Sequence, residues 1–275
     1  MSEPRQAGNA GGGPVVRLGS AGLTVVRYVG GLGWLLADTV RLTVLGLLGR
    51  VRLRRAPLAG QMVRVGVRSL GIIVLVHVFI GIILALQMAP VLDRYGQKLQ
   101  VATLVAIAQF RELGPLITAI VLSGFAGAAI AAELGTMVVA EEIEALQALA
   151  LDPIRFLVVP RVWATMVMTV CLTVVADLVG AFGGMLTGMM ALGINASAYY
   201  HASVDALVIR DLVTGLAKAG VFGLLIGLIA SFEGLRVSGG AAGVGRATTR
   251  TVVLSIFSLI LADCVFTIIF YAFHL

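Results

Sequence analysis

Long uncharged apolar runs alternate with short polar segments over most of this chain. A helix needs about 20 apolar residues to cross the hydrocarbon core of a bilayer, and the pattern predicts five such helices. The second starts near Val101 or Leu113, with Pro115 as a candidate kink. The five apolar runs are Ser69–Leu92, Leu113–Ala132, and runs within Val162–Leu192, Leu212–Phe232 and Thr251–Phe273.

The region before the first run has a different pattern. Arginines interrupt Val15–Arg68, and its longest uncharged pieces, Tyr28–Ala37 and Leu42–Gly49, are too short to span a bilayer. An amphipathic helix in the membrane interface fits this pattern better than the alternative, a spanning hairpin. Residues 1–14 are Gly-rich and polar, which predicts a disordered tail. The expected organisation is therefore a tail (1–14), an interfacial helical region (15–68) and a transmembrane permease domain (69–275).

Composition supports an all-α integral membrane protein. Of the 275 residues, 59% are hydrophobic and 12% are charged, against about 45–50% and about 25% in ordinary soluble domains. Ten of the twenty basic residues precede Ser69, which favours membrane topology and headgroup contact over nucleic-acid binding. Counting basic residues on alternate sides of the runs predicts a cytoplasmic N-terminus and an extracytoplasmic C-terminus.

The chain lacks the motifs of an enzyme that uses ATP or a metal. A P-loop needs a lysine between Gly and Ser or Thr, and neither Lys98 nor Lys218 has those neighbours. The Gly-rich Ser238–Arg250 follows no predicted strand, so we interpret it as a flexible turn. No HExxH motif occurs, and the histidines are dispersed. We expect no catalytic residue, metal or cofactor here, and we expect Cys171 and Cys264 to be buried packing residues.

Three ionisable residues interrupt the predicted spans: Asp177, Lys218 and Asp263. A charge at the bilayer centre costs about 2.5–3.5 kcal/mol on insertion scales, so each needs a partner or a wet cavity. We expect an interhelical network that links the third, fourth and fifth spans. Such a network either fixes helix packing as a buried ion pair or forms part of a proton or substrate path.

Arg111 and Glu112 lie in "QFRELGPL", at the predicted mouth of the second span. Neighbouring residues do not face one another on a helix, so we expect each charge to pair with another element. Their role is either anchoring at the interface or lining a substrate path. Small residues are dense at three places, which predicts close helix packing: Ser123–Gly135, Gly184-x-x-x-Gly188 and Gly223-x-x-x-Gly227.

A charged segment, "EEIEALQALALDP", joins the second and third runs on the predicted cytoplasmic side. Glu141 to Leu151 fits a short helix with its glutamates in the first turn, where the helix dipole favours negative charge. Asp152-Pro153 is expected to end this helix, because the residue before proline avoids the helical region. The segment is either a solvated loop or a docking element for a soluble partner. One side of the helix would carry Ile143, Leu146, Leu149 and Ala150.

These segments resemble the MlaE/YrbE family. The match rests on "RELGPLITAIVLSGFAGAAIAAELGTM", "EEIEALQALALDPIRFLVVPR" and "GGAAGVGRATTRTVV", and it covers about residues 15–275 in order and spacing. Members are permease subunits of ABC transporters that work with MCE-domain proteins. The resemblance implies a permease dimer, expected to be a homodimer, flanked by two ATPase subunits that bind the ATP. It also implies an MCE-domain lipid-binding protein on the far side of the membrane, and phospholipid in a cavity between the permease copies.

The resemblance also implies residue roles. The segment matching Glu141–Pro153 is the family's coupling helix, which enters a groove of the ATPase. The predicted function is the permease subunit of an ATP-driven lipid transporter. The alternatives are a proton-coupled secondary transporter that uses Asp177, Lys218 and Asp263, and a non-transporting membrane scaffold. Coupling contacts are assigned to Glu141, Glu142, Leu149, Leu151, Asp152 and Pro153, and the lipid path to Arg111, Glu112, Leu113, Gly114, Pro115, Gln87 and Met88.

Overall fold

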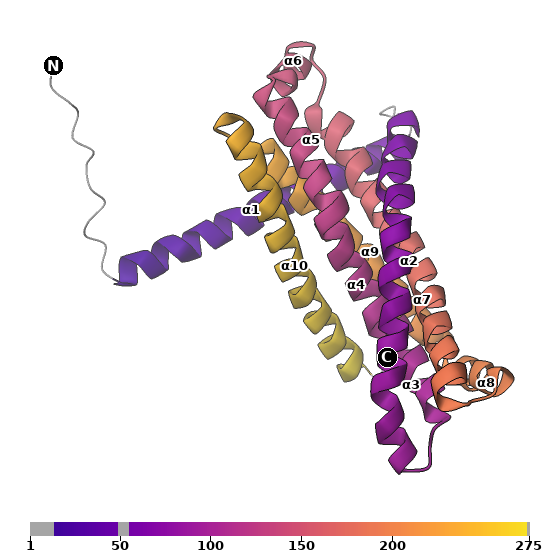
Figure 1. The fold of residues 1–275 in the computed structure, drawn as a ribbon. Coiled ribbons are helices and arrows are strands. Elements are labelled where there is room, and N and C mark those ends of the chain that lie inside the picture. Colours follow the sequence, from indigo (N-terminus) through magenta and orange to yellow (C-terminus); the bar gives the residue numbers. More distant parts are fainter. Residues whose placement is uncertain (1–13, 49–54, 274–275) are drawn as a thin grey trace.

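The computed structural model describes residues 14–48 and 55–273, and every regular element in these residues is helical (Figure 1). Three π-helical turns, η1 (Gln109–Leu113), η2 (Ser123–Gly127) and η3 (Ile154–Val158), interrupt or begin longer helices. The predicted tail, residues 1–14, lies outside the described residues except for Pro14, so its disorder stays a prediction. The α-helices are α1 (Pro14–Leu47), α2 (Arg55–Arg94), α3 (Gln100–Ala108), α4 (Gly114–Leu122), α5 (Ala128–Val139), α6 (Glu142–Ala148), α7 (Val159–Leu192), α8 (Ala196–Ala206), α9 (Ile209–Leu235) and α10 (Gly240–Ala272).

Within the described residues, five helical segments are long and apolar enough to cross a membrane, which confirms the predicted number of spans. One end of the bundle carries α6, and the other end carries α8 and the turn between α2 and α3 (Figure 1). We call these the α6 end and the α8 end. The five segments are Pro57–Arg94, Gln100–Val139, Ile154–Leu192, Ile209–Leu235 and Gly240–Ala272.

The first span extends further toward the N-terminus than its apolar run predicts. Helix α2 is continuous from Arg55, so Arg64 and Arg68 lie in the same helix as the run that begins at Ser69. The predicted boundary between the interfacial region and the transmembrane domain is therefore not a break in the helix. A helix tolerates an arginine whose head reaches water or a partner, and Arg64 is partly exposed and pairs with Glu133 of α5.

The second span begins near Val101 rather than near Leu113. Helices α3, α4 and α5 are joined by η1 and η2 into one continuous segment, Gln100–Val139. In an α-helix, the ring of Pro115 would clash with the carbonyl four residues earlier. The π turn just before the proline widens the helix there, and the Gly114 N–H donates to the Gln109 carbonyl. The proline is accommodated inside the span by this turn.

Glycines let the third span approach its neighbours closely, as expected for small residues at helix contacts. Gly183 of α7 lies against the Val78 backbone of α2, and a side chain at this position would meet that backbone. Gly223 of α9 lies in the same way against the α7 backbone at Met166. The main apolar core includes buried residues from five helices: Ile73, Leu122, Leu172, Phe222 and Leu259.

Helix α1 crosses the bundle at a steep angle to the spans (Figure 1). One face packs against the spans, where Leu35 is buried in an apolar cluster with Val162 and Leu228. Trp163 Nε1 of α7 donates to Thr43 Oγ1 of α1 at 2.8 Å. The other face exposes apolar side chains, among them Trp34. This arrangement agrees with an interfacial helix, although its place in a membrane stays a prediction.

Candidate substrate path and coupling segment

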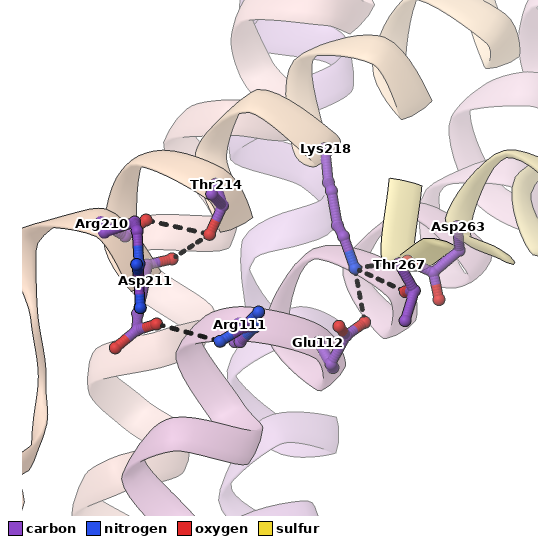
Figure 2. Close-up of polar contacts among 8 residues, drawn as sticks. All are labelled: Arg111, Glu112, Arg210, Asp211, Thr214, Lys218, Asp263 and Thr267. Carbon is purple, nitrogen blue, oxygen red and sulfur yellow. Dashed lines mark hydrogen bonds and ion pairs between the residues drawn. The ribbon is translucent and has the colours of Figure 1, made fainter. Parts of the chain in front are cut away.

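A buried lysine of α9 is the centre of an ion-pair group between three spans (Figure 2). Lys218 Nζ is 2.6 Å from Glu112 Oε2 of η1 and 2.9 Å from Asp263 Oδ1 of α10. The ammonium also donates to Thr267 Oγ1 at 3.4 Å, and it lies 5.7 Å from the centre of the Phe270 ring. The second, fourth and fifth spans are therefore joined through one cation.

The two carboxylates differ in how far they are exposed. The Lys218 side chain is fully buried, the Asp263 side chain is 16% exposed, and the Glu112 side chain is 34% exposed. A buried ammonium is stable only when it is paired, because desolvation of an isolated charge is expensive. Lys218 thus holds the Glu112 carboxylate at the edge of the group, where part of it faces outward.

A second ion pair lies beside the first (Figure 2). Arg111 Nη1 is 3.5 Å from Asp211 Oδ1 at the start of α9. The other oxygen, Asp211 Oδ2, accepts a hydrogen bond from the Val208 N–H at 3.2 Å, which satisfies a free donor at the helix N-terminus. Asp211 therefore orients Arg111 and caps α9 with the same carboxylate.

The two ion pairs follow from helix geometry. Asp211 and Lys218 are seven residues apart, which is about two turns, so they share a face of α9. Arg111 and Glu112 are adjacent on η1 and diverge, one toward each partner. The expectation that these neighbours pair with other elements is confirmed. Both lie inside the continuous second span, not at its mouth as predicted, because the helix begins at Gln100.

Asp177 does not belong to the Lys218 group. Its side chain is buried, and within the described residues neither carboxylate oxygen has a hydrogen-bond partner. Asp177 Oδ1 lies instead against the Gly114 backbone, and the neighbouring Ala176 carbonyl accepts from Gln109 Nε2 at 3.3 Å. The predicted network of Asp177, Lys218 and Asp263 is thus wrong in one member: Glu112 occupies the place that was assigned to Asp177.

The remaining residues assigned to the lipid path lie in two places. Leu113, Gly114 and Pro115 continue the helix from Glu112, and Gly114 and Pro115 are buried. Met88 packs in a separate apolar cluster near the α8 end, with Ala85, Val101 and Val105, and the side chain of Gln87 is exposed. The assignment is therefore split between the ion-pair group and the α2–α3 contact.

The segment between the second and third spans forms helix α6, which is shorter than predicted. Ala150 adopts a left-handed φ of 56°, and the N–H groups of Ala150 and Leu151 donate to the carbonyls of Gln147 and Leu146. This is the Schellman geometry that usually contains glycine. It ends the helix at Ala148, so Asp152-Pro153 does not. Asp152 Oδ1 instead accepts from the Ile154 N–H at 2.9 Å and supports the start of η3.

The surface of α6 is open to solvent. None of its residues is buried, and Leu149, which follows it, is 71% exposed. Glu142 and Glu144 lie in its first turn, as predicted, and Glu141 precedes the helix with a left-handed φ of 58°. The leucine and the glutamates are therefore available to another molecule.

Two further expectations concern single residues and metals. Cys171 and Cys264, expected to be buried, are both exposed on the outside of the bundle. The hydropathy pattern does not reveal Asp211, although an acidic residue three positions after Val208 at the start of a span is a capping signal. Within the described residues, no group of three His, Cys, Asp or Glu side chains is placed to hold a metal ion.

The fold and the site define a multi-pass membrane protein with charged pairs buried between its spans and an exposed helix at one end. The family described as Permease MlaE matches residues 58–269. The intermembrane phospholipid transport system permease protein MlaE of Haemophilus influenzae is 32% identical over 257 residues, which cover 92% of this chain and 96% of that protein. A probable ABC transporter permease protein of Rickettsia felis is 38% identical over 211 residues, 77% of this chain and 82% of that protein.

A plant protein is similar over the same length. Protein TRIGALACTOSYLDIACYLGLYCEROL 1, chloroplastic, of Arabidopsis thaliana is 36% identical over 211 residues, 77% of this chain and 60% of that protein. The chain belongs to the MlaE permease family of ABC transporters. The resemblance found in the motifs is therefore confirmed.

Proposed function

We propose that this chain is the permease subunit of an ATP-driven phospholipid transporter in the inner (plasma) membrane, and that a separate ATPase subunit binds and hydrolyses the ATP. Family membership supports a transport subunit rather than an enzyme, and the name of the Haemophilus influenzae relative supports phospholipid as the substrate. The proposed assembly contains two copies of this chain, two ATPase subunits and an MCE-domain protein on the opposite side of the membrane.

The exposure of helix α6 is the main support for this proposal. The helix lies at one end of the bundle (Figure 1), none of its residues is buried, and Leu149 is largely exposed. A short helix followed by an exposed leucine fits a groove on a soluble partner. We place the α6 end in the cytoplasm, because most basic residues outside the apolar runs fall on that side. The ATPase would then contact Glu141, Glu142, Leu149, Leu151, Asp152 and Pro153.

The proposed lipid path passes Arg111 and Glu112. Each of these side chains is about one-third exposed, at 30% and 34%, and each is held from behind by a buried partner on α9. A guanidinium and a carboxylate in adjacent positions offer charge-assisted hydrogen bonds to the phosphate and the ammonium of a zwitterionic headgroup. The buried partners would keep both charges in place when no lipid is bound.

The alternative, a proton-coupled secondary transporter, has less support. That mechanism uses Asp177, Lys218 and Asp263 as one relay, but Asp177 has no hydrogen bond to either of the others. Lys218 is engaged by Glu112 and Asp263, an arrangement that joins three helices. The family match also favours an ATP-driven system.

Replacement of Leu149 by alanine tests the proposal. Burying a leucine side chain contributes about 1.5–3 kcal/mol, so Leu149→Ala should weaken binding of the ATPase subunit about tenfold or more. The measurement is co-purification of the ATPase, followed by lipid transport in proteoliposomes. Leu99→Ala is the matched control, because Leu99 is also exposed but lies at the α8 end. If Leu149→Ala binds the ATPase and transports lipid as the unmodified protein does, α6 is not the docking element.

A further inference from the structure

A second group of ion pairs joins the helices that lead into and out of the α6 segment. Glu133 of α5 lies between two arginines from other spans. Its Oε2 is 2.7 Å from Arg64 Nη1 of α2, and its Oε1 is 3.0 Å from Arg161 Nη2 of α7. One carboxylate therefore connects the first, second and third spans. We call Glu133, Arg64 and Arg161 the three-helix clamp.

Arg161 is the buried member of the three-helix clamp. Its side chain is 5% exposed, whereas that of Arg64 is 47% exposed. A second nitrogen of the same guanidinium, Arg161 Nη1, donates to the Leu157 carbonyl at 2.7 Å. Leu157 lies in η3, the π turn that begins directly after Pro153. Arg161 thus holds the chain that leaves the α6 segment, while its partner Glu133 lies on the helix that enters it.

The clamp limits how α6 can move. Charge-assisted hydrogen bonds of this length are among the strong ones in proteins, and separating them would leave a buried guanidinium without its carboxylate, which is strongly unfavourable. A force applied to α6 therefore reaches α5 and η3 together instead of bending one past the other. Arg64 extends the same connection to α2. The clamp touches neither the exposed face of α6 nor the Lys218 group.

We propose that Glu133 is a positioning residue for energy coupling: the three-helix clamp makes the two helices that flank α6 move with α2 as one unit when a partner docks. This inference rests on the proposed role of α6 as the docking element. The residues of the clamp belong neither to the proposed ATPase contacts nor to the proposed lipid path. Its loss should therefore separate ATP hydrolysis from lipid movement without releasing the ATPase.

Glu133→Gln tests the inference in the full complex of permease, ATPase and MCE-domain protein reconstituted in vesicles. The amide keeps the size of the side chain but removes the charge that both arginines share. The readout is lipid moved per ATP hydrolysed. We expect the complex to assemble and to hydrolyse ATP, with the ratio lowered about tenfold, within the usual range of coupling between sites. Glu133→Asp keeps the charge on a shorter side chain and should restore part of the ratio.

The control removes an ion pair of similar length at the other end of the bundle. Asp93 Oδ1 is 3.1 Å from Lys98 Nζ near the α8 end, and both side chains are about half exposed, at 54% and 50%. Asp93→Asn should leave both the hydrolysis rate and the ratio of lipid to ATP unchanged. A drop in Asp93→Asn equal to that in Glu133→Gln would overturn the inference, because any lost ion pair would then have the same effect.

Three further outcomes decide the remaining cases. An unchanged ratio in Glu133→Gln overturns the role of the clamp, even where Leu149→Ala shows that α6 docks the ATPase. Normal binding and transport in Leu149→Ala removes the proposed docking itself. If Glu133→Gln does not assemble, Arg161→Lys decides, because a single ammonium nitrogen cannot replace the two nitrogens that contact Leu157 and Glu133. An assembled Arg161→Lys complex with a lowered ratio supports the inference, and one with a normal ratio overturns it.

Discussion

Lys218 is the residue whose replacement gives the sharpest test of the buried charges. Lys218→Met keeps a long apolar side chain beside Phe270 but removes the cation that Glu112 and Asp263 share. Breaking a buried ion pair from one side costs about 3–5 kcal/mol, because the remaining charge is buried without a partner. The Glu112 side chain is one-third exposed and therefore less enclosed than that of Asp263, so most of the loss comes from Asp263. We therefore expect about 3 kcal/mol, the lower end of this range.

The assay is equilibrium unfolding of the purified protein in detergent micelles. Removal of the second charge as well provides the control, since replacing a whole buried ion pair with apolar side chains is often neutral. The double variant Lys218→Met with Asp263→Leu should recover about 2 kcal/mol of the loss, and that recovery measures the coupling between the two sites. A loss below about 1 kcal/mol in Lys218→Met, or a double variant no more stable than the single one, would refute the reasoning.

Three other changes probe backbone and packing features. Gly114→Ala would place a methyl group against Asp177 Oδ1 and the Gln109 carbonyl. This overpacking should lower the free energy of unfolding by about 1–3 kcal/mol. Adding Asp177→Ala should recover most of this loss, and no recovery would show that the strain lies elsewhere. Ala150 has a left-handed backbone conformation, which costs a non-glycine residue about 1–2 kcal/mol. Ala150→Gly removes this cost, so backbone hydrogen exchange of residues 142–151 should become slower. Faster exchange would contradict the Schellman geometry. Burial raises the pKa of Tyr199 in α8 from 10.0 to about 12. The neutral hydroxyl therefore contributes to the free energy of unfolding fully below pH 10, and this contribution is lost as the pH rises through 12. In Tyr199→Phe the free energy of unfolding should not show this loss across that pH range. A pH profile identical to that of the unmodified protein would argue against the burial.

The number of spans follows from the sequence, but their ends do not. Runs without charge are long enough to identify five membrane helices, and the described part of the chain contains five helices long and apolar enough to span a membrane. The first span, α2, continues past Arg64 toward its N-terminus, because the Arg64 charge is paired with Glu133, which lies 69 residues further along the chain. A hydropathy pattern treats every arginine as an interruption. It contains no information about a partner on another helix.

The residues of the candidate site could also be predicted only in part. Burying an unpaired charge is costly, and this correctly predicts that Lys218 pairs with Asp263. The sequence, however, contains both Asp177 and Glu112 as candidates for the second acid. The choice depends on the rotation of the second span about its axis, and the π turn η1 changes that rotation just where Glu112 lies. Regular helical periodicity does not reveal a π turn. A hydropathy pattern excludes Asp211 from the fourth span, because Asp211 is the last residue before the apolar run that marks this span.

The positions of the π turns fit the proposed transmission. In the described part of the chain they occur only in the second span, as η1 and η2, and at the start of the third span, as η3. These are the two helices that flank α6. A π turn replaces α-helical hydrogen bonds with a wider, less regular pairing and often marks a functional site, so these two helices have defined places where they can shift.

The clamp and the π turns therefore have complementary effects along the second span. Glu133 lies in α5, between η2 and α6, so the part of the second span next to α6 is fixed to α2 and α7, while η1 and η2 lie further from α6. Movement of α6 would displace α5 as a unit and would be absorbed at η2 and at η1, which contains Arg111 and Glu112. Glu112 would then move relative to Lys218, which α9 holds in place. A path from the proposed docking helix to the proposed lipid path thus needs no hinge in a loop, because the second span contains its own.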